Sequence, residues 1–152
     1  LGAVLLLIYL QIVLGGIVRH LHAGLVCIDI PLCNGELWPS AHPMQRLHML
    51  HRMGGVLVAL AVFWISVQLL KEERAGKWVR LLAGLAPFLV IAQVTLGLLS
   101  VTTFLGLVPV TAHLGGGALL LATFVSLWMI CRRAGLSPAE ISAPSGVQAA
   151  GV

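Results

Sequence analysis

Two histidines occupy matching positions in the two halves of this chain. His51 and His113 each stand near the start of a long apolar stretch, and each is followed at the third and fourth positions by two glycines. A polar ring inside a membrane is costly unless it has a partner. Because two imidazoles can hold one iron from opposite sides, the pattern predicts a heme with His51 and His113 as axial ligands. A hydrogen bond between two helices, without a cofactor, is the alternative.

The glycines that follow the histidines allow two interpretations. Residues three and four positions apart lie on one face of a helix, so Gly55 and Gly117 are predicted to leave room for a flat macrocycle beside the rings. Close packing of helices is the alternative. A zinc site is disfavoured, because zinc needs more ligands than His48, His51 and His113 offer.

The match between the halves extends beyond the histidines. Gln11 and Gly15 lie in the first apolar stretch in the same order as Gln93 and Gly97 in the third. The chain is therefore predicted to consist of two parallel two-helix repeats, related by a pseudo-twofold axis along the membrane normal. This symmetry places the two histidines at similar depth, facing each other across the axis.

Composition assigns the chain to a membrane. Of its 152 residues, 59% are hydrophobic and 9% are charged, which excludes a soluble domain and predicts an all-α integral membrane protein. Long uncharged runs predict a four-helix transmembrane bundle within residues 1–134. A break near residues 106–109 divides the last run, because proline restricts the residue before it and removes a backbone donor. The predicted helices are 2–20, 46–70, 80–103 and 109–131.

Basic residues predict the orientation. They follow the second helix and end the fourth, and such residues accumulate on the cytoplasmic side. The outer loop, residues 21–45, is then outside, and the net charge of +4 reflects topology rather than nucleic-acid binding. Residues 135–152 are small and polar and predict a disordered cytoplasmic tail. No basic segment precedes Leu1, so the native chain is expected to begin earlier.

Two cysteines lie in the outer loop. Cys27 and Cys33 enclose five residues, in a compartment where disulfides persist, so a loop disulfide is the leading prediction. A redox-active pair and a metal site completed by His20 or His22 are the alternatives. Cys131, at the inner end of the fourth helix, is expected to be a free thiol.

Three further side chains surround the predicted heme site. His48 precedes His51 by three residues and can line the same pocket, where its imidazole would shuttle protons; an interfacial histidine in contact with water is the alternative. Arg52 and Arg19 can bind heme propionates, since arginine binds carboxylates with two donors. Arg19 is also suited to a surface anchor.

The motifs together resemble the heme A synthase family of prokaryotic and mitochondrial membranes. The similarity covers nearly everything except the tail, and most members have eight helices in two homologous halves, of which this chain is similar to one. It implies assembly with other copies or with a partner, such as heme O synthase or an electron donor. The residues that carry it are Gly15-Gly16-Ile17-Val18-Arg19, Ala23-Gly24-Leu25-Val26-Cys27-Ile28-Asp29-Ile30-Pro31-Leu32-Cys33-Asn34-Gly35, His51-Arg52, Gln93 and His113.

The resemblance implies an activity, a cofactor and a location. It implies an oxidoreductase in the prokaryotic inner membrane that converts the methyl group of heme O to a formyl group, giving heme A for cytochrome oxidase. The cofactor would be heme B, or heme O as substrate, with His51 and His113 as axial ligands and Cys27 with Cys33 as the outer pair. From the residues themselves, His48 and Arg52 are predicted to be catalytic. One position departs from the family, because a glutamate stands in place of His48 in the catalytic half of the long forms.

Two other classes of protein stay open at this point. A non-catalytic b-type heme-binding or electron-transfer membrane protein on the same scaffold is the main alternative. A four-helix membrane protein without heme is the other.

Overall fold

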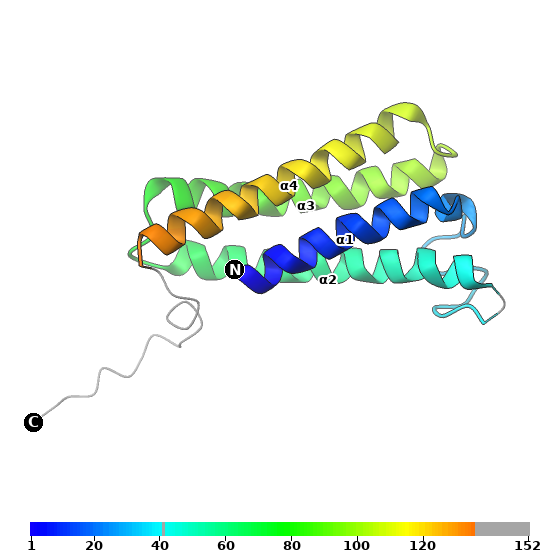
Figure 1. Cartoon of the computed structure of the whole chain (residues 1–152), viewed down its shortest axis with the longest axis horizontal. Helices are drawn as coiled ribbons and strands as arrows, with labels where there is room; N and C mark the ends of the chain where they lie inside the picture. The colour runs from blue at the N-terminus through cyan, green and yellow to red at the C-terminus, as the bar shows by residue number, and fades with distance from the viewer. Residues whose placement is uncertain (41, 136–152) are drawn as a thin grey trace, which may run out of the picture.

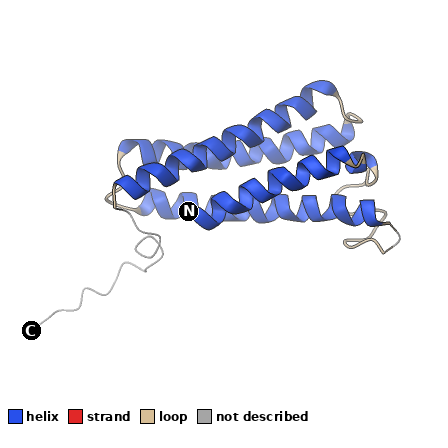
Figure 2. Ribbon diagram, viewed as in Figure 1, coloured by secondary structure: helices blue, strands red, loops and turns tan. Residues whose placement is uncertain are grey.

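The apolar stretches form four helices, each long and apolar enough to cross a membrane. The computed structural model describes residues 1–40 and 42–135, and within these residues it holds no β-strand (Figure 2). The predicted four-helix membrane bundle is confirmed, and its predicted helix bounds differ from the observed ones by at most three residues. The predicted tail lies outside the described residues, apart from Gly135. The elements are α1 (Gly2–His20), the short 3₁₀ helix η1 (Ala23–Leu25), α2 (Pro43–Lys71), α3 (Lys77–Thr102) and α4 (Leu107–Arg133).

The helices form a ring in which neighbours in sequence are neighbours in space. They run alternately in opposite directions, so α1 and α3 are parallel to each other, as are α2 and α4 (Figure 1). The contact of α3 with α4 is the most extensive and that of α1 with α4 the least. The parallel course of α1 with α3 and of α2 with α4 is the arrangement that two parallel repeats require.

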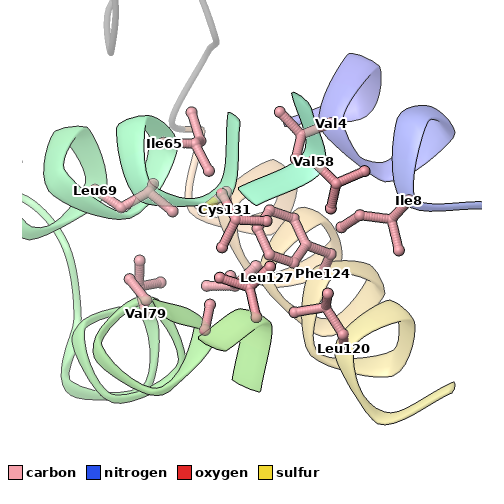
Figure 3. Packing of buried hydrophobic residues seen from close by; sticks show 14 of the residues in the cluster. Val4, Ile8, Val58, Ile65, Leu69, Val79, Leu120, Phe124, Leu127 and Cys131 are labelled. Atoms are coloured by element: carbon pink, nitrogen blue, oxygen red, sulfur yellow. The ribbon is translucent and has the colours of Figure 1, made fainter. Parts of the chain in front are cut away.

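The apolar core occupies the half of the bundle away from the outer loop. Phe124 is fully buried in this core and lies among side chains from the other helices (Figure 3). Many large apolar side chains point outward instead, which a lipid bilayer requires of a membrane helix. The buried core residues are Val4, Ile8, Val58, Val62, Ile65, Leu69, Ala75, Val79, Ala83, Ala86, Val90, Leu120, Phe124, Leu127 and Cys131.

An arginine closes the turn between α2 and α3. The last carbonyls of a helix lack partners within the helix, and here the guanidinium of Arg80 binds them. It donates to the carbonyl oxygens of Leu70 at 3.1 Å, Glu72 at 3.0 Å and Ala75 at 3.1 Å. The turn is therefore held by a cation at the negative end of the α2 dipole.

The outer loop is a small disulfide-bonded unit. Cys27 and Cys33 form the predicted disulfide and are fully buried, so their sulfurs are not available to a metal site with His20 or His22. Cys33 and Glu36 exchange backbone hydrogen bonds of 3.0 Å across a tight turn. Asn34 and Gly35 have positive φ there, as an Asn-Gly turn requires. Cys131 is a free thiol, as expected, and it is buried.

Candidate functional site

His51 and His113 face each other across the bundle. His51 comes from α2 and His113 from α4, and their ring centres are 6.5 Å apart, with the ring planes at 88°. A metal–imidazole bond is about 2 Å long, so two imidazoles on opposite sides of one iron have ring centres roughly 6 Å apart. The separation and the donor chemistry of this pair therefore fit a bis-histidine heme iron.

A glutamine from α1 binds the His51 ring. The Gln11 amide nitrogen lies 3.0 Å from Nδ1 of His51 and donates to the backbone oxygen of His51 at 2.8 Å. Both partners are on α2, so a single amide joins the first two helices beside the ring. The contact holds the ring by Nδ1, so Nε2 is the only ring nitrogen of His51 that the Gln11 amide does not contact.

The equivalent ring in the second repeat is bound by the backbone. Nδ1 of His113 donates to the backbone oxygen of Gln93, 3.0 Å away. This bond joins α4 to α3, as the Gln11 contact joins α2 to α1. Each repeat thus orients its histidine through a glutamine at the equivalent position, by side chain in one repeat and by main chain in the other.

Two glycines let the helices approach the rings. A Cβ at Gly15 would lie 2.9 Å from Cε1 of His51, and one at Gly97 would lie 3.3 Å from Cε1 of His113. A methyl group at Gly15 would meet the ring at a distance that real Cβ contacts do not show. From the sequence, Gly15 and Gly97 are recognised only as markers of the repeat. Their spacing of four residues from Gln11 and Gln93 is the signal that could have placed them beside the histidine rings.

The glycines that follow the histidines make room for the glutamines. The side chain of Gln11 lies where a Cβ at Gly54 would be, and the side chain of Gln93 lies where a Cβ at Gly116 would be. At Gly55 and Gly117 a Cβ would be in ordinary contact with the same glutamines, at 3.5 and 3.6 Å. From the sequence, space for a macrocycle is predicted beside Gly55 and Gly117. In the structure, the atoms nearest to a Cβ at these two positions include the glutamine amides.

Arg52 has different partners from those predicted. Its guanidinium donates to the backbone oxygens of Asp29 at 2.7 Å and Leu32 at 3.1 Å, and also to that of Cys27. These three carbonyls belong to the outer loop, so the arginine that was expected to bind a propionate holds the loop against α2. The carbonyl oxygens stabilise the positive charge of the guanidinium, as water would at the surface.

His48 and Arg19 lie in opposite kinds of environment. His48 is 4% exposed, and its Nδ1 has no hydrogen-bond partner among the described residues. A buried polar atom without a partner costs free energy, so this nitrogen keeps an unmet hydrogen bond in the structure. Arg19 is exposed in the last turn of α1.

Comparison with known proteins gives a consistent set of relatives. Residues 1–125 match the model of the family described as cytochrome oxidase assembly protein, COX15-CtaA. The chain is 32% identical over 142 residues to the heme A synthase of Maricaulis maris, covering 84% of this chain and 40% of that protein. It is 34% identical over 113 residues to that of Symbiobacterium thermophilum, covering 70% of this chain and 35% of the relative. No solved structure matches the chain.

The relatives are much longer than this chain. The heme A synthase of Shewanella oneidensis, which is 30% identical over 141 residues, is matched over 41% of its length. The chain thus spans less than half of the curated relatives compared here.

Replacing Arg52 with glutamine tests its role in the loop. We expect the backbone amides of residues 27–33 to exchange with solvent at least tenfold faster, because charged hydrogen bonds of about 1.5–3 kcal/mol each are lost. Hydrogen exchange measured by mass spectrometry in detergent provides the readout. Arg19→Gln, which changes an exposed arginine, is the matched control and should leave the loop protected. Unchanged exchange in Arg52→Gln would contradict the role.

Proposed function

This chain belongs to the heme A synthase family, and we propose that it oxidises the methyl group of heme O to a formyl group, giving heme A for cytochrome oxidase. The family model covers residues 1–125. The observation that carries the proposal is the facing pair of imidazoles, His51 and His113, with ring centres 6.5 Å apart. Relatives named heme A synthase support the activity, and this chain spans less than half their length.

In this proposal the two histidines hold a heme and the glutamines hold the histidines. His51 and His113 would hold the iron through Nε2, since each Nδ1 has a hydrogen-bond partner. When bound, the heme would supply the redox chemistry of the site. Arg19 is the proposed contact for a propionate, and Gly55 and Gly117 are the proposed contacts for the macrocycle. The heme is heme B, or heme O as substrate.

His48 is the proposed proton-transfer residue. It lies one helical turn from His51 on the side of the outer loop, and its buried Nδ1 has no partner in the described part of the chain. An imidazole can take up a proton there, where family members with a glutamate have a carboxylate. Arg52 contributes by holding the outer loop over this region, a positioning role rather than contact with the substrate.

The histidine at position 48 also favours a second function. A histidine in place of the family glutamate removes the carboxylate, and the described helices carry no acidic side chain near the histidine pair. A b-type heme-binding or electron-transfer membrane protein needs only the two axial ligands. The identity of the extracted heme separates the two functions.

The proposed partners are those that the family resemblance implies. We propose that this chain works as a homo-oligomer. Heme O synthase is the proposed source of substrate, and an electron donor is required for turnover. The bilayer covers the outward apolar faces of the four helices.

We propose a place in the prokaryotic inner membrane with the cysteine loop outside. The basic residues that support this orientation lie at the other end of the bundle, where positive charge is retained on the cytoplasmic side. The predicted cytoplasmic C-terminus would follow α4. The basic residues are Lys71, Arg74, Lys77, Arg80, Arg132 and Arg133.

Replacing either facing histidine tests the ligation. We expect His51→Ala and His113→Ala each to abolish the low-spin heme spectrum of the purified protein, because one axial ligand is lost in each. Optical and electron paramagnetic resonance spectra measure this. His42→Ala, at an exposed position outside the pair, should keep the spectrum. A low-spin spectrum that persists in both variants would refute the ligand assignment.

Coexpression with a heme O synthase tests the reaction. We expect the wild-type chain to yield heme A, and His48→Phe to lower the yield by about 100-fold or more while the low-spin spectrum remains, because proton transfer is lost and the ligands are kept. Chromatography of the extracted hemes measures the yield. Heme B alone from the wild type would instead identify the b-type heme protein.

Thiol labelling of intact cells tests the orientation. A membrane-impermeant maleimide added outside should label Cys27 and Cys33 only after reduction of their disulfide, because reduction frees both thiols and loosens the outer loop that buries them. Cys131 should label only after the bundle is denatured, because it is buried. Mass spectrometry locates the label, and loop labelling that requires cell lysis would reverse the orientation.

A further inference from the structure

The two repeats bind their histidines in different ways, and we propose that Gln11 is a positioning residue that sets the tautomer of His51. The inference rests on the proposed function in one respect, namely that His51 is an axial ligand. In the first repeat the partner of the ring is a side-chain amide, and in the second it is a backbone carbonyl. The repeats are alike in sequence at these positions, so the difference is a property of the folded chain.

The geometry at Gln11 determines which group faces the ring. One end of the amide lies 2.8 Å from the backbone oxygen of His51. A carbonyl oxygen repels another at that distance, so this end is the NH₂ group, which has two hydrogens to donate. The same nitrogen lies 3.0 Å from Nδ1 of His51. Nδ1 therefore accepts a hydrogen bond, and the neutral ring of His51 carries its proton on Nε2.

The geometry at Gln93 gives the opposite tautomer for His113. A backbone oxygen can only accept, so Nδ1 of His113 carries the proton that it donates to Gln93 over 3.0 Å. Nε2 then presents a lone pair. This is the arrangement that orients metal-binding histidines in general, with one ring nitrogen donating to a carbonyl and the other free to bind.

The difference makes the two proposed ligands unequal. His113 is ready to bind iron at Nε2, whereas His51 binds at that nitrogen only after its proton has moved to Nδ1. Gln11 opposes that move, because its NH₂ group faces Nδ1 and its amide oxygen lies beside Gly54. Gln11 is thus placed to control the second axial bond.

Gly54 holds Gln11 in this place. The amide oxygen of Gln11 lies where a Cβ at Gly54 would be, so any side chain at that position displaces the glutamine from the ring. The glycine therefore gives a second way to disturb the contact without changing Gln11 or His51.

Nitrogen NMR of the heme-free protein, labelled with ¹⁵N-histidine, tests the inference. We expect wild-type His51 to carry its proton on Nε2 and His113 on Nδ1. Gln11→Met, which keeps the length of the side chain and removes the amide, should shift the His51 signals toward the other tautomer. Gln93→Met is the matched control and should leave both rings unchanged, because the backbone carbonyl remains. Gly54→Ala should reproduce the effect of Gln11→Met.

The outcomes separate this inference from the proposed function. Wild-type His51 with its proton on Nδ1, or equal effects of Gln11→Met and Gln93→Met, would overturn the role of Gln11. The wild-type tautomers need no variant, so a variant that fails to fold leaves the test intact. A wild-type chain that takes up no low-spin heme would refute the ligation instead, while the spectra of the heme-free protein still decide the role of Gln11.

Discussion

The structure depends on placing two imidazoles inside an apolar bundle with a hydrogen-bond partner for Nδ1 of each ring. In hydrocarbon a polar group without a partner costs several kcal/mol by order of magnitude, so each ring needs a hydrogen bond from a neighbouring helix. Gln11 and Gln93 supply those bonds, and glycines on the facing helices make room for rings and amides. The opposite half of the bundle carries the apolar core, which leaves the half near the outer loop for chemistry.

The outer loop depends on this half of the bundle through Arg52. Its guanidinium donates hydrogen bonds to three carbonyl oxygens of the loop. The disulfide between Cys27 and Cys33 shortens the loop segment that these hydrogen bonds hold in place. The loop is thus attached to α2 at the residue next to His51. Arg80 performs a similar task at the other end of α2, where it binds the last carbonyls of the helix.

Duplication explains why the site has two histidines, and it also explains how their hydrogen bonds differ. Two copies of a helix pair bring one histidine each to a common axis at similar depth. Once the copies are covalently joined, each position can diverge, and the same glutamine now uses its side chain in one repeat and its backbone in the other.

The sequence by itself determined the helices, the repeat, the facing histidines and the loop disulfide. Length and hydropathy predict helices because every backbone group in a membrane must bond within its own segment, and repeat symmetry is enough to bring His51 and His113 together. Tertiary structure alone decided that Arg52 binds the loop, that His48 is buried without a partner for Nδ1, and that Gln11 occupies the space left by Gly54. These contacts depend on how each helix is rotated about its axis and on the path of the loop. Both are set by packing between residues that are far apart in the chain. The spacing of residues in one sequence does not predict such packing.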